Sequence, residues 1–66
     1  MITLKDRLKE LRKSKSMTQK EVAEKLNITR EAYTLYETGK NVPTIETLKK
    51  LAELYQTSID YIVGRY

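Results

Sequence analysis

The sequence predicts an all-α fold, a compact arrangement of five helices in a single domain over residues 1–66. Only two Gly and one Pro occur, and no segment alternates apolar and polar residues as a half-buried strand would. Apolar residues instead recur every three or four positions, which is the spacing of one face of a helix. Thr or Ser stands before each such segment, where a helix N-cap is expected. A chain of this length has room for one hydrophobic core.

The first predicted helix spans residues 4–14, with Thr3 as a candidate N-cap. Leu4, Leu8 and Leu11 lie one turn apart and form its apolar face. Most of the Lys and Arg residues around this face are expected in solvent, where they add long-range attraction for an anion or have no partner.

The second predicted helix spans residues 18–26 and opens with Thr-Gln-Lys-Glu, which is a capping box. Met17 and Val22 are spaced for a hydrophobic staple across this cap. Leu26 shares the inner face with Val22. Asn27 ends the helix, because Asn tolerates the left-handed conformation of a helix C-terminus.

The third predicted helix spans residues 29–38, follows a turn of about three residues, and is ended by Gly39. Tyr33, Tyr36 and Glu37 fall on its inward side. Two helices joined by so short a turn are a candidate helix-turn-helix, in which the second helix enters the major groove of DNA. Plain helical hairpins use the same spacing, so the spacing alone leaves both interpretations open.

Two further helices complete the predicted domain. Thr44 follows Pro43 and caps the fourth helix, whereas Ser58 caps a short fifth helix that Gly64 ends. The apolar stripes are formed by Ile45, Leu48, Leu51, Ala52 and Tyr55 in the fourth helix and by Ile59 and Ile62 in the fifth. These stripes predict a structural role for both helices.

Charge is distributed unevenly along the chain. Residues 1–42 hold ten Lys or Arg against six Asp or Glu, whereas residues 43–66 hold three of each, so the net charge of +4 belongs to the first part. This distribution fits a nucleic-acid-binding face beside a neutral packing or dimerisation region. A solvated basic surface without a partner would have the same composition.

The residue types that are missing argue against several classes of function. The chain has no Cys and no His, so no disulfide, soft-ligand metal site or cofactor is expected. Asp6 and Asp60 are far apart and suit helix surfaces, so no nucleophile–base pair and no enzyme activity are predicted. No continuous apolar stretch suits a signal peptide or a membrane span, and a reducing cytoplasm is the expected location.

Residues 19–39 and 43–64 carry a specific order of elements: Gln at a helix start, Ala, Tyr-Glu-x-Gly, Pro and Leu-Ala. Over nearly the whole chain they resemble the Xre/Cro and lambda-repressor-type helix-turn-helix transcriptional regulators. The resemblance implies a bacterial or phage-encoded, lambda-repressor-like DNA-binding domain. Its helix-turn-helix is formed by helices 2 and 3, and the first turn of helix 3 reads bases. Asn27 stands where the family usually has Gly, a change that the same backbone accepts.

The predicted base contacts are Arg30, Glu31, Thr34, Ala32 and Leu35. Arg can bind guanine with two hydrogen bonds, Glu can accept one from the cytosine amino group, and Thr or an apolar residue can touch a thymine methyl. Alternatives remain for two of them. Glu31 suits the helix dipole without any ligand, and Leu35 is also explained as an ordinary exposed apolar residue.

The predicted phosphate contacts are Gln19, Thr18, Thr29, Lys40 and Asn41. Helix capping by itself accounts equally well for the two Thr residues. The resemblance also implies a partly buried salt bridge between Arg12 and Glu37, which we assign to architecture and not to DNA contact.

The predicted function is sequence-specific binding of double-stranded DNA by a transcriptional regulator, a repressor that acts as a homodimer on an inverted repeat with half-sites about 34 Å apart. The candidate dimer interface is Leu54, Tyr61, Val63 and Tyr66, unless these are scattered surface apolar residues. The alternative function is a protein-interaction module on the same fold, antitoxin-like or coactivator-like. Because the chain ends at Tyr66, no small-molecule-binding domain is expected.

Overall fold

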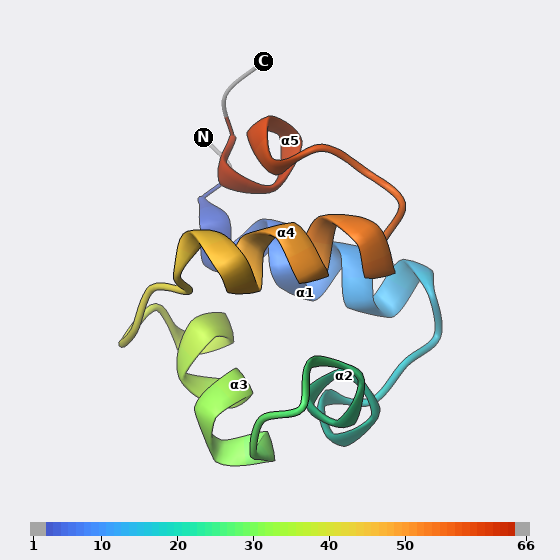
Figure 1. The fold of residues 1–66 in the computed structure, drawn as a ribbon, viewed down its shortest axis with the longest axis vertical. Coiled ribbons are helices and arrows are strands. Elements are labelled where there is room, and N and C mark those ends of the chain that lie inside the picture. Colours follow the sequence, from blue (N-terminus) through green and yellow to red (C-terminus); the bar gives the residue numbers. More distant parts are fainter. Residues whose placement is uncertain (1–2, 65–66) are drawn as a thin grey trace.

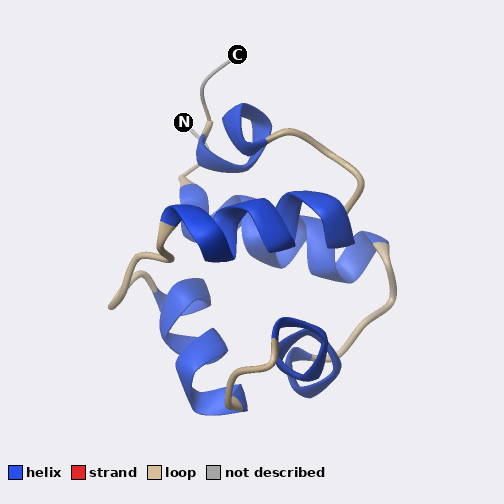
Figure 2. Cartoon of the chain, in the orientation of Figure 1, coloured by secondary structure: helices blue, strands red, loops and turns tan. Residues whose placement is uncertain are grey.

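The five predicted helices are all present in the computed structural model, which describes residues 3–64 (Figures 1 and 2). They are α1 (Leu4–Ser14), α2 (Gln19–Leu26), α3 (Arg30–Thr38), α4 (Ile45–Leu54) and α5 (Ile59–Val63). Residues 3–64 contain no strand. The all-α prediction is therefore confirmed.

Helix N-caps explain where most of these helices begin. Thr18 and Glu21 form the complete capping box at α2, and the side chains of Thr29, Thr44 and Ser58 each accept a backbone hydrogen bond at their own helix.

Thr3 differs from the other caps. It holds the N-cap position of α1, but its hydroxyl donates to Asp6 Oδ2 at 2.8 Å and makes no cap hydrogen bond to the helix. The same hydrogen bond lowers the pKa of Asp6.

Left-handed residues are the C-caps of three helices, and the left-handed Ser16 and Gln56 follow the C-caps of the other two. Asn27 has φ 60° and ψ 41°, and the backbone N–H of Ile28 donates to Ala23 O at 3.0 Å across the end of α2. Gly39 and Gly64 end α3 and α5 with φ 80° and 82°. The Asn-for-Gly change at the turn is accommodated as expected.

One core joins the five helices. Figure 1 shows α1 and α4 across the middle of the molecule, with α5 on one side of them and the α2–α3 pair on the other. The buried core consists of Leu8, Val22, Ala23, Leu26, Tyr33, Leu48, Leu51, Tyr55 and Ile62. Helix α3 packs against both α1 and α2, so its orientation is set by two neighbours.

The structure corrects two expectations about burial. Ile45 was expected in the inner stripe of α4, yet it is 63% exposed. It is the first residue of α4 and does not belong to the core cluster. The basic residues of α1 were expected in solvent, yet Arg7 is only 4% exposed. Its guanidinium lies 3.9 Å from the ring centroid of Tyr61, and its Nη1 donates to Tyr61 Oη at 2.8 Å.

Candidate nucleic-acid interface

The α2–turn–α3 unit is held at both ends of the turn. Asn27 turns the chain in the left-handed conformation, Ile28 packs partly buried against the core, and the Thr29 hydroxyl accepts from Ala32 N at 3.1 Å. α2 and α3 are in direct contact. This is the geometry of a helix-turn-helix, with α3 as the second helix.

The inner side of α3 is anchored by buried polar groups. Tyr33 is fully buried, its ring meets Tyr36 edge to face at 6.2 Å, and its hydroxyl lies 3.1 Å from that of Tyr55. Burial raises the pKa of Tyr33 far above its usual value, so the hydroxyl stays protonated. The hydroxyl of Tyr33 therefore has a structural partner inside the fold.

A buried ion pair fixes the same side of α3 to α1. Arg12 Nε donates to Glu37 Oε2 at 2.7 Å and Arg12 Nη2 to Glu37 Oε1 at 3.2 Å, with Glu37 only 1% exposed. Burial by itself raises the pKa of Glu37, but hydrogen bonds from Arg12, Tyr33 and Gln19 outweigh it and hold the pKa below its usual value. Glu37 is thus an ionised carboxylate inside the fold.

The opposite side of α3 faces solvent. Arg30 and Glu31 are exposed, Leu35 is 39% exposed, and Thr34 is half-buried. These four residues line one shallow hollow of about 320 Å³. Four of the five predicted base-contact residues are thus brought together on one surface, whereas Ala32 is half-buried and does not line the hollow.

A second hollow, of about 530 Å³, lies where the start of α2 meets α3. It is lined by Arg12, Met17, Thr18, Gln19, Lys20 and Arg30. The Thr18 hydroxyl is used in the capping box, as the Thr29 hydroxyl is in its own cap. Lys20 also lines this hollow, although it was not among the predicted phosphate contacts. Its basic side chain in the first turn of a predicted helix-turn-helix is a signal that could have pointed to it.

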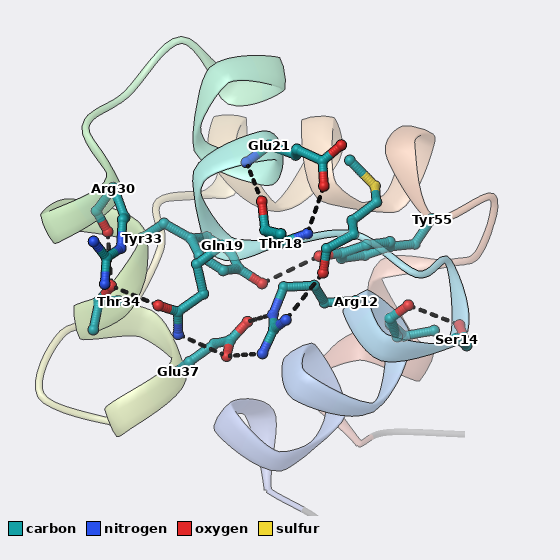
Figure 3. A network of polar contacts seen from close by, with 12 residues as sticks. Arg12, Ser14, Thr18, Gln19, Glu21, Arg30, Tyr33, Thr34, Glu37 and Tyr55 are labelled. Carbon is teal, nitrogen blue, oxygen red and sulfur yellow. Dashed lines mark hydrogen bonds and ion pairs between the residues drawn. The ribbon is translucent and has the colours of Figure 1, made fainter.

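Gln19 takes part in an internal network of hydrogen bonds (Figure 3). Its Nε2 donates to Glu37 Oε1 at 3.2 Å, and its Oε1 accepts from the Thr34 hydroxyl at 3.2 Å. Gln19 therefore links the buried ion pair to the solvent-facing side of α3. The other predicted phosphate contacts, Lys40 and Asn41, are exposed just after α3.

The predicted dimer residues lie around α4 and α5. Leu54 and Val63 are half-buried against the core, Tyr61 is half-buried over Arg7, and Tyr66 lies outside the described residues. The burial of Arg7 was not predicted from the sequence, although its position three residues after Leu4 places it beside the apolar face of α1.

Two classes of site are not found in the part of the chain that the structure describes. None of its helices is long and apolar enough to cross a membrane. Residues 3–64 also contain no group of three or more acidic, His or Cys side chains placed to hold a metal ion.

The fold and this surface define a helix-turn-helix protein. The family model described as helix-turn-helix matches residues 8–62, and the chain belongs to that family. It is 45% identical over 64 residues to the HTH-type transcriptional regulator ImmR of Bacillus subtilis, covering 97% of this chain and 50% of that protein. It is 38% identical over 63 residues to the cryptic phage CTXphi transcriptional repressor RstR of Vibrio cholerae, covering 96% of this chain and 56% of the repressor.

The chain thus spans about half the length of the curated relatives it matches. Among solved structures, the P22 c2 repressor protein in complex with a synthetic operator superposes with a TM-score of 0.90. The match covers 96% of both chains at 22% identity, which establishes a shared fold. The predicted lambda-repressor-like architecture is confirmed.

Proposed function

We propose that this chain is the sequence-specific, double-stranded DNA-binding domain of a transcriptional regulator, and that α3 enters the major groove. The observation that carries the proposal is the exposed side of α3, where one hollow is lined by Arg30, Glu31, Thr34 and Leu35. The opposite side of the same helix is held to α1 by the Arg12–Glu37 ion pair. Relatives at 38% and 45% identity are named as a repressor and a regulator, which supports the same function.

The residues divide by the part of DNA that they meet. Arg30 and Glu31 offer hydrogen-bonding groups to base edges, and Leu35 offers an apolar contact. Ala32 has only a methyl to contribute. The phosphate contacts are Thr18, Gln19, Thr29, Lys40 and Asn41, with Lys20 added by its place in the second hollow.

The mode of action is proposed as repression by a homodimer on an inverted repeat in a bacterial cytoplasm. Half-sites about 34 Å apart would place two α3 helices in successive major grooves on one face of the duplex. Leu54, Tyr61, Val63 and Tyr66 remain the proposed contacts between copies. The assembly on DNA is tested by sedimentation with the selected duplex. A chain that stays monomeric on DNA at high concentration would contradict the proposed dimer.

In vitro selection from random duplex DNA tests the proposal directly, because it returns half-site, symmetry and spacing together. The Arg30→Ala/Glu31→Ala double variant is expected to lose specific binding while keeping the fold. Glu24→Ala/Lys25→Ala is the matched control, since it removes one charge of each sign from exposed positions late in α2. Unchanged operator affinity in the Arg30→Ala/Glu31→Ala variant would show that α3 is not the reading helix.

A second candidate function is a protein-interaction module, antitoxin-like or coactivator-like. It is favoured by Val42 and Ile45, which are 69% and 63% exposed around the loop between α3 and α4. Under this alternative, selection returns no DNA sequence, and Val42→Ser/Ile45→Ser abolishes partner binding that Arg30→Ala/Glu31→Ala leaves intact.

A further inference from the structure

The ionised carboxylate of Glu37 decides which way the Gln19 amide points. A carboxylate only accepts hydrogen bonds, so the group of Gln19 that faces Glu37 Oε1 has to be the NH₂ and not the carbonyl. The other hydrogen bonds to the carboxylate come from Arg12, which is only a donor, and from the protonated Tyr33 hydroxyl. The Gln19 Oε1 is consequently directed away from the ion pair, toward α3 (Figure 3).

That orientation in turn decides what the Thr34 hydroxyl does. Gln19 Oε1 can only accept, so the Thr34 Oγ1–H donates to it at 3.2 Å. The backbone carbonyl of Arg30, one turn earlier, accepts from the same hydroxyl at 2.8 Å. The hydroxyl proton of Thr34 therefore has two acceptors within the protein itself.

We infer that Thr34 reads DNA through its methyl group and not as a hydrogen-bond donor, with Gln19 as the residue that positions it. The inference deepens the proposed DNA-binding function and rests on it. With the hydroxyl proton used internally, Thr34 offers no donor to guanine O6 or N7 or to thymine O4. Thr34 keeps its methyl group, and with Leu35 it lines the hollow that α3 presents to solvent. The base chemistry that suits a methyl group is the C5-methyl of thymine.

A measurement on the protein without DNA tests the internal part. Three-bond couplings from the backbone N and C′ to Thr34 Cγ2 are expected to report a single side-chain rotamer. The Gln19 side-chain amide protons are expected to exchange more slowly than those of Gln56, whose residue is exposed. Averaged couplings, or equal exchange of the two amides, would overturn the inference whatever the DNA results show.

A measurement on DNA tests the reading. Each thymine of the selected half-site is replaced in turn by uracil, which removes the C5-methyl and keeps every hydrogen-bonding group. One position is expected to weaken binding by about fourfold, the factor for one buried methyl-sized group. Thr34→Val, which keeps methyl groups and removes the hydroxyl, should retain that sensitivity. Thr34→Ser, which keeps the hydroxyl and removes the methyl, should lose it at that position.

Leu35→Ala is the matched control, because Leu35 is the other apolar residue of the hollow. It should change uracil sensitivity at a different position and leave the Thr34 position unaltered. Sensitivity that survives in Thr34→Ser and disappears in Thr34→Val would assign the reading to the hydroxyl and overturn the inference. A selection that returns no sequence contradicts the proposed function, whereas a selected site that is indifferent to uracil throughout contradicts this inference alone.

Discussion

The two sides of α3 differ in how their polar groups are used. On the inner side, Tyr33 and Glu37 are buried; Glu37 is hydrogen-bonded to Arg12 of α1, and Tyr33 to Tyr55, which directly follows α4. On the outer side, Arg30 and Glu31 are exposed and form no ion pair with another residue in the 3–64 range. One nine-residue helix therefore carries a structural face and a proposed binding face, and Gln19 connects them through Thr34 and Glu37.

This difference has a physical meaning. Buried polar groups that lose a partner cost free energy, so the inner side resists substitution. Exposed groups away from the core change stability little when they are replaced, so residues on the outer side can vary without loss of the fold.

Arg12→Ala should destabilise the fold by about 3 kcal/mol, since it leaves the Glu37 carboxylate buried without its cationic partner. Urea unfolding followed by circular dichroism measures the change. Lys13→Ala, at an exposed position of the same helix, is the control and should stay within about 0.5 kcal/mol of the unmodified chain. An Arg12→Ala variant as stable as this control would show that the ion pair does not stabilise the fold.

Stability should fall in acid because of Glu37. Its pKa is lowered by folding from the ordinary value of 4.5, so its stabilising contribution is complete above pH 4.5 and is lost as pH falls through the lower, folded pKa. Glu37→Gln should therefore unfold with a shallower dependence on pH below about 4.5. Asp6 and Glu21 also have lowered pKa values and leave a residual slope. Equal slopes in both proteins would contradict the assignment.

Tyr33→Phe should cost about 1 kcal/mol, because it removes a buried hydroxyl that pairs with Tyr55 and leaves the ring in place. Thermal unfolding measures the effect. Tyr36→Phe is the comparison, since Tyr36 is half-buried and keeps its ring contact with Tyr33. A larger loss of stability in Tyr36→Phe than in Tyr33→Phe would contradict the assignment of the buried hydrogen bond to Tyr33.

The smallest effect on stability is expected on the outer side. Arg30→Ala/Glu31→Ala should unfold within about 0.5 kcal/mol of the unmodified chain, even though it loses specific DNA binding. Unfolding in urea and DNA binding by fluorescence anisotropy, measured on the same preparation, separate the two properties. A loss of stability comparable to that of Arg12→Ala would mean that α3 does not have two distinct sides.

Much of the fold was predictable because its signals are local. The capping box at Thr18, the left-handed Asn27 and the Gly residues after α3 and α5 act over a few residues, so their sequence spacing is sufficient to bound the helices. The division of α3 into Tyr33 and Glu37 inside and Arg30 outside follows from helical periodicity alone.

The helices, their ends and the two sides of α3 follow from local sequence, because capping, turn conformation and periodicity are short-range effects. The packing of the helices against one another is what buries Arg7 under Tyr61, 54 residues away, and leaves Ile45 exposed. It also decided that Gln19 bridges Glu37 and Thr34. These outcomes depend on which helices meet and where each one ends against its neighbour, and helical periodicity within one segment carries no information about either.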